Sequence, residues 1–192
     1  PMEGAAIRPI HSACFEEGSL HMLRLRPYKS CDAETIAAWI KNETVFRNWG
    51  GERFGSYLIT PASIDNKYAR DNGDCAEPDN FYPWVAVNED ERVVGHLIMR
   101  YTGGDHRQLR FGWVIVDDTL RGKGYGQQML RLGLRYAFEL LQAEVVTIGV
   151  LEGNEAARQC YRKVGFLETG LVQEGDWMVV EMRITNSIVQ EA

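Results

Sequence analysis

A short glycine-rich segment between two differently patterned apolar runs constrains the fold most strongly. Residues 121–126 read RGKGYG. The preceding residues 108–116 read as a strand, and residues from about 125 to 142 carry apolar side chains at helical spacing. A helix start leaves four backbone N–H groups without intrahelical partners and carries partial positive charge. Because glycines let the backbone approach a bulky anion closely, the segment predicts a pyrophosphate cradle between a strand and a helix.

Spacing excludes two better-known phosphate-binding loops. A Walker loop has its lysine directly before Ser or Thr, whereas Lys123 precedes Gly124. A dinucleotide-binding fingerprint requires a third glycine at the position of Gln127. A glycine-rich turn that only caps a helix stays open as the plainer interpretation.

The order of strand-like and helix-like segments predicts a mixed α/β domain. Asp32 is the predicted N-cap of the first helix, Ile64 and Tyr68 are expected to face inward from the second, and Gly165 is expected to end the last. Strands are expected at 21–28, 84–101 (a hairpin), 108–116, 143–150 and 166–184 (a closing hairpin), helices at 34–40, after 61, at 125–142 and at 154–164, and connecting regions at 46–63 and 70–83.

Composition limits the class of protein. The chain has 192 residues, which suits one domain, and a formal net charge of −6, which argues against a general nucleic-acid binder. No apolar run is long enough to span a bilayer, so no membrane association is expected. Four scattered cysteines, Cys14, Cys31, Cys75 and Cys160, show no metal-ligand spacing and favour free thiols in the cytoplasm. We expect residues 1–21 to be an N-terminal extension, either disordered or added to the native chain, followed by one domain over 22–185 and a tail over 186–192.

A second signal lies in residues 154–166, NEAARQCYRKVGF. Asn154 and Tyr161 are seven residues apart, nearly two helical turns, so both face the same side of one helix. Taken singly, Asn154 reads as an N-cap and Tyr161 as a core residue. Their place one helix and one strand after the glycine-rich segment favours a shared site.

The two segments together resemble the signatures of the GNAT acyltransferase superfamily. The first matches its Gln/Arg-x-x-Gly-x-Gly/Ala pattern through Arg121, Gly124 and Gly126. The second is similar to Asn-x-x-Ala-x-x-x-Tyr-x-x-x-Gly-Phe, matched at Asn154, Ala157, Tyr161, Gly165 and Phe166. The resemblance implies an α/β (α+β) fold with a mixed, mostly antiparallel central sheet of about six to seven strands and about four flanking helices.

The resemblance also implies an activity: an N-acetyltransferase that uses acetyl-CoA and no metal, with direct attack of a primary amine through a tetrahedral intermediate. The pantetheine arm is expected between the strands at 109–116 and 144–150, as a surrogate strand. The amide of Val116 would lie near the thioester carbonyl, and Tyr161 would be the general acid. The residues assigned to acetyl-CoA are Val114, Val116, Arg121, Gly122, Lys123, Gly124, Tyr125, Gly126 and Asn154.

Other parts of the site stay open at the level of sequence. The ribosomal-protein N-terminal branch of the family keeps a glutamate where this chain has Gly149, which argues against that branch. The base is left open among Glu152, Asp117, Asp118, His96 and water. Seven aromatic residues are expected to build the acceptor pocket: Phe46, Trp49, Phe54, Tyr57, Phe81, Tyr82 and Trp84. The acidic residues Asp71, Asp74, Glu77 and Asp79 either attract a cationic amine or form a solvated loop.

Two classes of function are weighed. The first is the active enzyme, with a small-molecule or peptide amine as acceptor, such as a polyamine, an aminoglycoside, an amino acid or a protein N-terminus. The second is a non-catalytic sensor or regulatory domain that binds acyl-CoA. Since dimers are common in the family, a homodimer is left open.

Overall fold

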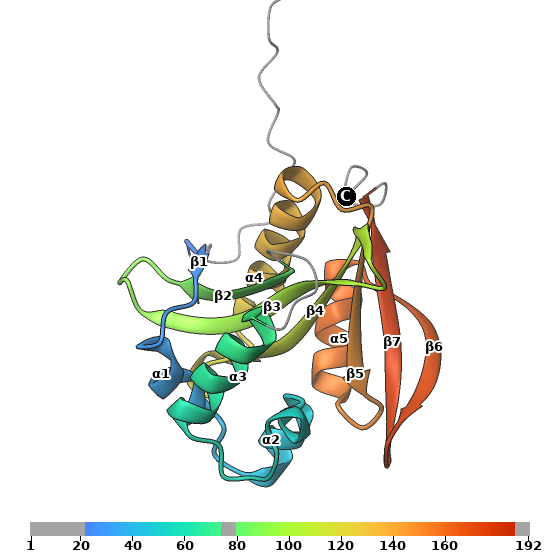
Figure 1. The fold of residues 1–192 in the computed structure, drawn as a ribbon. Coiled ribbons are helices and arrows are strands. Elements are labelled where there is room, and N and C mark those ends of the chain that lie inside the picture. The colour runs from blue at the N-terminus through green and yellow to red at the C-terminus, as the bar shows by residue number, and fades with distance from the viewer. Residues whose placement is uncertain (1–21, 74–79, 187–192) are drawn as a thin grey trace, which may run out of the picture.

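Seven strands form one sheet in residues 22–73 and 80–186, the part of the chain that the computed structural model describes (Figure 1). The spatial order is β1-β2-β3-β4-β5-β7-β6, and every neighbouring pair is antiparallel except β4 and β5. The strands are β1 (Arg24–Pro27), β2 (Phe81–Val87), β3 (Val93–Thr102), β4 (Asp105–Val116), β5 (Val145–Leu151), β6 (Leu167–Glu174) and β7 (Trp177–Thr185).

Helices cover both faces of this sheet (Figure 1). On one face α4 and α5 bury a core built around Met129, Leu130 and Phe166. On the other face α1 and α3 bury a second core around Ile36 and Ile64. The helices are α1 (Asp32–Trp39), α2 (Glu43–Asn48), α3 (Pro61–Gly73), α4 (Tyr125–Arg135) and α5 (Glu155–Val164), with short helical turns η1 (Gly51–Phe54), η2 (Asp118–Leu120) and η3 (Tyr136–Leu140).

The mixed α/β fold predicted from the sequence is confirmed. Ile64 and Tyr68 are buried, as expected, and Gly165 ends α5 in the left-handed conformation. The long helix predicted over 125–142 is α4 followed by one π-helical turn, η3. The sequence pattern missed α2, which overlaps only the start of the connecting region predicted over 46–63, because its six residues are too few to show a period.

The prediction that Asp32 caps α1 is wrong. The helix already begins at Asp32, and the N-cap position belongs to Cys31, which makes no side-chain cap. The Asp32 carboxylate instead accepts two hydrogen bonds of 2.7 Å from the Arg26 guanidinium and one of 2.8 Å from the Lys29 backbone N–H. A charged partner from a neighbouring strand therefore takes the acceptor that a cap would have used.

Strands β4 and β5 separate before they end. Their parallel pairing runs from Gln108 opposite Val145 to Phe111 opposite Ile148 and then stops. The next residues of β4 contain a bulge, because Trp113 and Val114 together face one residue of β3. Trp113 has φ = 46°, a conformation that bulky residues rarely adopt. The bulge turns β4 away from β5 and leaves a V-shaped opening in the sheet.

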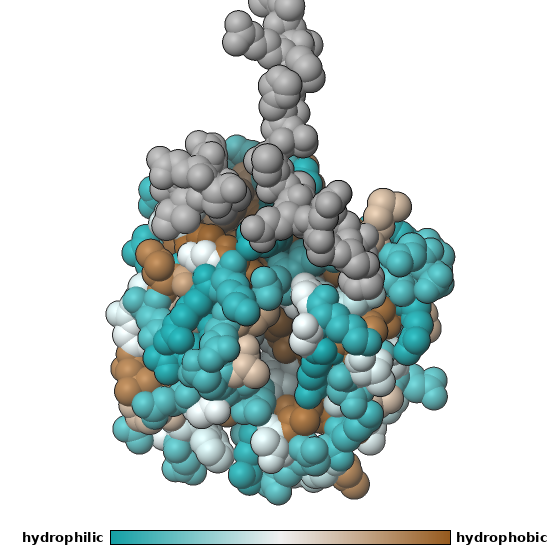
Figure 2. Space-filling model, turned by 180° about the vertical axis from the view of Figure 1, so that it is seen from behind, coloured by the Kyte–Doolittle hydropathy of each residue, from teal (hydrophilic) through white to brown (hydrophobic). Residues whose placement is uncertain are grey.

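In the ranges described above, no helix is both long enough and apolar enough to cross a bilayer. Figure 2 shows a largely hydrophilic face, with hydrophobic residues at the bottom of a recess near its middle. Cys31 and Cys160 are free thiols. Cys14 and Cys75, the proposed extension over 1–21 and most of the tail lie outside the described residues.

We expect Asp32→Asn to lower the free energy of unfolding by about 2 kcal/mol at neutral pH, because it leaves the half-buried Arg26 without its counter-charge. Desolvation opposes ionisation of Asp32, but the hydrogen bonds from Arg26 and Lys29 outweigh it and lower its pKa. A lowered folded-state pKa stabilises the fold above the ordinary pKa and loses that contribution as the pH falls through the folded value. The deficit of the variant should therefore shrink in acid.

Urea unfolding at neutral pH and at about pH 3 would measure this. Asp105→Asn is the control, because that carboxylate pairs with an exposed arginine and its loss should cost little. A deficit of the same size at both pH values would contradict the ion-pair explanation.

Candidate active site

Two cavities of about 440 Å³ each lie at the V-shaped opening. One is lined by the glycine-rich segment, the start of α4 and one side of α5, and is called here the glycine-loop cavity. The other is lined by basic side chains from α2, η1, α3, β3 and β4, and is called the arginine cavity. Trp49, Val114 and Tyr161 line both cavities, so the two spaces meet at the bulge of β4.

The glycine-rich segment has the backbone that its sequence predicts. Gly122 and Gly124 have φ of 76° and 86°, and Gly124 is the N-cap residue of α4. A Cβ added at either glycine would meet no atom within 4 Å, so open space lies over these amides. The structure thus places an amphipathic helix start with exposed amides at one end of the glycine-loop cavity.

Nearly all the residues assigned to the cofactor line this one cavity. They are Val114, Val116, Arg121, Gly122, Gly124, Tyr125, Gly126 and Asn154. Lys123 is the exception: it is exposed and does not line the cavity, and its backbone N–H donates to the Leu120 carbonyl over 3.4 Å. The tight turn that this bond closes directs Lys123 to the surface.

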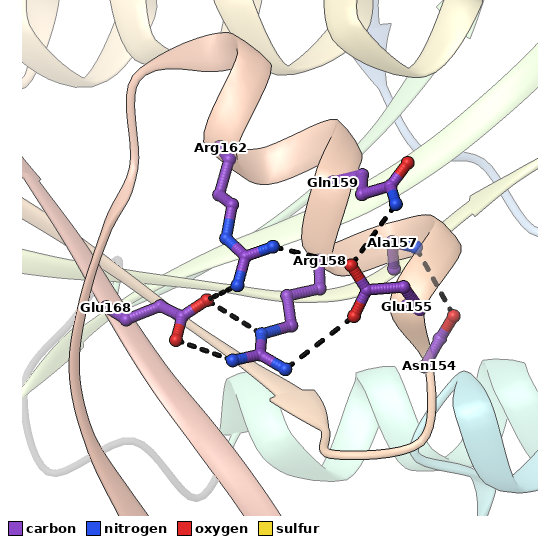
Figure 3. A network of polar contacts seen from close by, with 7 residues as sticks. All are labelled: Asn154, Glu155, Ala157, Arg158, Gln159, Arg162 and Glu168. Atoms are coloured by element: carbon purple, nitrogen blue, oxygen red, sulfur yellow. Dashed lines mark hydrogen bonds and ion pairs between the residues drawn. The ribbon is translucent and has the colours of Figure 1, made fainter.

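Asn154 is the N-cap of α5 in the structure. Its Oδ1 accepts a hydrogen bond of 3.3 Å from the Ala157 backbone N–H (Figure 3). The capping role read from the sequence is therefore present, and it places the side chain at the edge of the glycine-loop cavity as well.

A polar network fixes α5 against the sheet (Figure 3). Arg158 donates two hydrogen bonds of 2.7 Å to the Glu168 carboxylate at the start of β6, and Arg162 contacts the same carboxylate. The hydrogen bond from Arg158, with the second arginine, lowers the pKa of Glu168 to about 2. The ionised clamp holds the helix that carries Tyr161.

Tyr161 is 6% exposed, and the surface that it retains faces both cavities. Its ring packs against Phe166, with centroids 6.2 Å apart. Burial raises the pKa of the phenol above its ordinary value, and the neighbouring Cys160 raises it by a smaller amount. The hydroxyl is therefore protonated at neutral pH, as a proton donor must be.

None of the four residues considered as the general base lies in the lining of either cavity. His96 is fully buried, with Nδ1 2.8 Å from the Trp84 carbonyl and Nε2 2.6 Å from the Tyr68 hydroxyl, and burial lowers its pKa to about 4. The other three also have structural places: Asp117 accepts from Thr119 and pairs with Arg92, Asp118 pairs with Lys41, and Glu152 is exposed.

Gly149 has no room for the glutamate kept by another branch of the family. A Cβ at this position would lie 2.5 Å from Arg110 Nη2 and 3.0 Å from a methyl carbon of Val179. Arg110 is held there by Glu181 through two hydrogen bonds of 2.6 and 2.7 Å. An ion pair therefore occupies the space that a side chain on β5 would need.

Of the seven aromatic residues predicted to build the acceptor pocket, only Trp49 lines the cavities. Trp49 lines both cavities, and Phe54 supports Trp113 with ring centroids 4.9 Å apart. Tyr82 and Trp84 lie on the opposite face of the sheet, because alternate residues of β2 point to opposite faces. Phe46 and Phe81 are buried in the core around Ile36, and Tyr57 packs against Phe46.

The sequence pattern missed the basic lining and two tryptophans. Arg47, Arg53, Lys67, Arg100, Arg110, Trp113 and Trp177 all line the arginine cavity. They come from six elements, and the only signal in the sequence was the like-charged pair of strand residues Arg100 and Arg110. Of the acidic loop, Asp71 lies in α3 and binds Lys67 over 2.9 Å, while Asp74, Glu77 and Asp79 fall outside the described residues.

No metal site is apparent in the described part of the chain. There, no group of three or more His, Cys, Asp or Glu side chains comes together in a way that could hold a metal ion.

The fold is that of an acyltransferase domain. Residues 22–167, more than half of the chain, match the family described as acetyltransferase (GNAT) domain. The chain therefore belongs to the GNAT acetyltransferase family, which confirms the resemblance found in its two motifs.

Individual relatives are more distant. The peptidyl-lysine N-acetyltransferase YjaB of Escherichia coli is 37% identical over 93 residues, which is 48% of this chain and 54% of that protein. The chain thus spans about half the length of this relative. The spermidine N(1)-acetyltransferase of Vibrio cholerae is 24% identical over 153 residues, 79% of this chain and 83% of that protein.

Solved structures share the fold. Spermidine N-acetyltransferase of Vibrio cholerae in complex with CoA and spermine has a TM-score of 0.70 at 20% identity, covering 86% of this chain and 96% of that one. An aminoglycoside acetyltransferase in complex with coenzyme A has a TM-score of 0.72 at 18% identity, covering 89% and 99%. Identities this low show the common architecture.

We expect Gly149→Ala to destabilise the protein by about 1–3 kcal/mol, because the new methyl group must displace the Arg110 guanidinium from Glu181. Thermal unfolding would measure the loss. Gly170→Ala is the matched control: this strand glycine would place its Cβ in open space, so the change should be neutral or slightly stabilising. Equal melting temperatures for the two variants would show that the ion pair adapts without cost.

Proposed function

We propose that the protein transfers an acetyl group from acetyl-CoA to a primary amine. The observation that carries the proposal is the meeting of two cavities at Tyr161 and the bulge of β4. Direct transfer between two bound substrates needs a donor cavity and an acceptor cavity that meet where the reacting atoms lie. Membership of the GNAT family supports the same chemistry.

The glycine-loop cavity would hold the donor. The diphosphate would bind amides of the segment from Gly122 to Gly126 other than that of Lys123, which donates to Leu120. Arg121 would add positive charge in an otherwise acidic protein. The pantetheine arm would lie in the opening beyond Phe111, where β4 has no neighbour in β5, and would hydrogen-bond to Val114 and Val116.

The reaction proceeds by direct attack. The uncharged amine nitrogen adds to the thioester carbonyl, and the Val116 N–H stabilises the oxyanion of the tetrahedral intermediate. The C–S bond then breaks, and Tyr161 donates its proton to the departing thiolate. Water in the open arginine cavity would take the proton that the amine loses, after which proton exchange with solvent restores the phenol.

Several features of the protein stay predictions from the sequence. They are a single domain over 22–185, a cytoplasmic location, the absence of nucleic-acid and membrane partners, and a homodimer.

The competing function is a non-catalytic sensor of acyl-CoA. Release of free thiol from acetyl-CoA in the presence of an amine panel would support the enzyme, whereas binding without turnover on every amine would support the sensor.

We expect Gly124→Ala to weaken coenzyme A binding at least tenfold, because a Cβ at this N-cap position projects into the space over the amides. Isothermal titration would measure the affinity. Gly103→Ala is the matched control, since Gly103 has φ = 68° in the β3–β4 turn and also meets no atom within 4 Å.

Both variants should lose about 1 kcal/mol of stability from backbone strain, and Gly124→Ala alone should lose affinity. Unchanged affinity in Gly124→Ala would place the phosphates elsewhere.

We expect Tyr161→Phe to lower turnover by roughly tenfold or more with coenzyme A affinity retained, because only the proton donor is removed. Steady-state thiol release at saturating amine would measure it. Tyr136→Phe serves as the control, because Tyr136 packs against Trp84 and lines neither cavity. Full turnover in Tyr161→Phe would remove Tyr161 from this role.

A further inference from the structure

Arg100 occupies an unusual electrostatic position in the arginine cavity. It lies on β3 directly opposite Arg110 of β4, so two cations stand side by side on the same face of the sheet. Like charges at opposed positions of neighbouring strands are destabilising unless a counter-charge is supplied. Both side chains line the cavity.

The other cations of this cavity have their counter-charges. Four of the five basic side chains bind a carboxylate with N–O distances of 2.5–2.9 Å. The pairs are Arg47 with Glu43, Arg53 with Glu174, Lys67 with Asp71 and Arg110 with Glu181. Within residues 22–73 and 80–186, no carboxylate forms an ion pair with Arg100.

Arg100 is exposed to the solvent that fills the cavity, but its neighbours still raise the cost of its charge. Desolvation in the cavity, followed by the charges of Arg53 and Arg110, lowers the pKa of its guanidinium. Three carboxylates also line the cavity: Glu52 is exposed on η1, whereas Asp71 and Glu174 pair with Lys67 and Arg53. The charges of Asp71 and Glu174 raise the pKa of Arg100, but desolvation and the two arginines outweigh them. An anion that enters the cavity would relieve this repulsion, and a guanidinium can bind a carboxylate or a phosphate through two parallel hydrogen bonds.

We infer that the amine acceptor carries an anionic group, a carboxylate or a phosphate, which binds Arg100. This inference rests on the proposed function and narrows its substrate class. The amine end of the acceptor lies toward Tyr161, and the apolar part between the two ends lies against Trp113 and Trp177. The acceptor is therefore an acidic amine of the amino-acid or peptide type, because a polycation such as a polyamine would bring a further positive charge to the opposed pair Arg100 and Arg110.

A homologous series of amines tests the inference on the intact protein. Each ω-amino acid is compared with the alkylamine, the diamine and the aminoalkyl phosphate of the same length, by thiol release from acetyl-CoA and by thermal shift without acetyl-CoA. We expect an anionic member to be preferred over its alkylamine by roughly ten- to a hundredfold in KM, with kcat little changed. The carboxylate and phosphate arms identify which anion is bound.

Three variants assign the preference to Arg100. Arg100→Gln should raise the KM of the anionic amines toward that of the alkylamine, which removes the preference, and Arg100→Glu should shift the preference toward the diamine. Arg107→Gln, at an exposed arginine of β4 outside both cavities, should keep it. Circular dichroism confirms that each variant is folded.

The outcomes separate the two proposals. No thiol release with any amine would overturn the proposed function, and the thermal shifts would still show whether anionic amines bind through Arg100. Thiol release with the diamine preferred in the wild type, or an Arg100→Gln variant that loses all amines equally, would overturn the anionic acceptor alone.

Discussion

The early separation of β4 from β5 is the constraint on which the site depends. It is held by the bulge at Trp113, whose positive φ is of a kind that costs of order 1–3 kcal/mol and persists only where packing enforces it. The enforcing contacts are visible: the indole N–H of Trp49 donates to the Trp113 carbonyl over 2.8 Å, and the rings of Phe54 and Tyr68 pack against the Trp113 side chain. The helices and turns between β1 and β2 therefore keep the sheet open.

The opening gives its two sides different chemistry. The glycine-loop cavity presents backbone amides, which suit a phosphate chain and make little demand on side chains. The arginine cavity presents paired charges and indole rings, which depend entirely on side chains from distant elements. Tyr161 reaches both because α5 runs beside the opening, clamped to β6 by Glu168 (Figure 3). A cavity lined by backbone amides thus adjoins a cavity lined by charged and aromatic side chains.

The donor side was predictable because its determinants are local. A left-handed glycine, a helix start and a helical spacing of seven residues are all properties of short segments, so the helix starts at Gly124 and Asn154 were predictable before any tertiary contact was known, while the assignment of these residues to acetyl-CoA stays a prediction. The sequence did not reveal that Lys123 lies outside the glycine-loop cavity, because one hydrogen bond in the turn directs its side chain outward. The prediction of the aromatic pocket was wrong where side chains alternate along a strand. It grouped Tyr82 and Trp84 with Phe81, although neighbouring residues of β2 face opposite cores.

By itself, the sequence determined the order of elements, the glycine-rich helix start, the shared face of Asn154 and Tyr161, and through them the family. Only the tertiary structure decided that Asp32 pairs with Arg26 instead of capping a helix, that the Arg110–Glu181 pair fills the space beside Gly149, and that Arg100 faces a cavity without a partner among the described residues. The physical reason is the range of the forces involved. Backbone conformation and helical period are set within a few residues, whereas charge pairing and cavity lining depend on side chains up to 121 positions apart, as for Arg53 and Glu174.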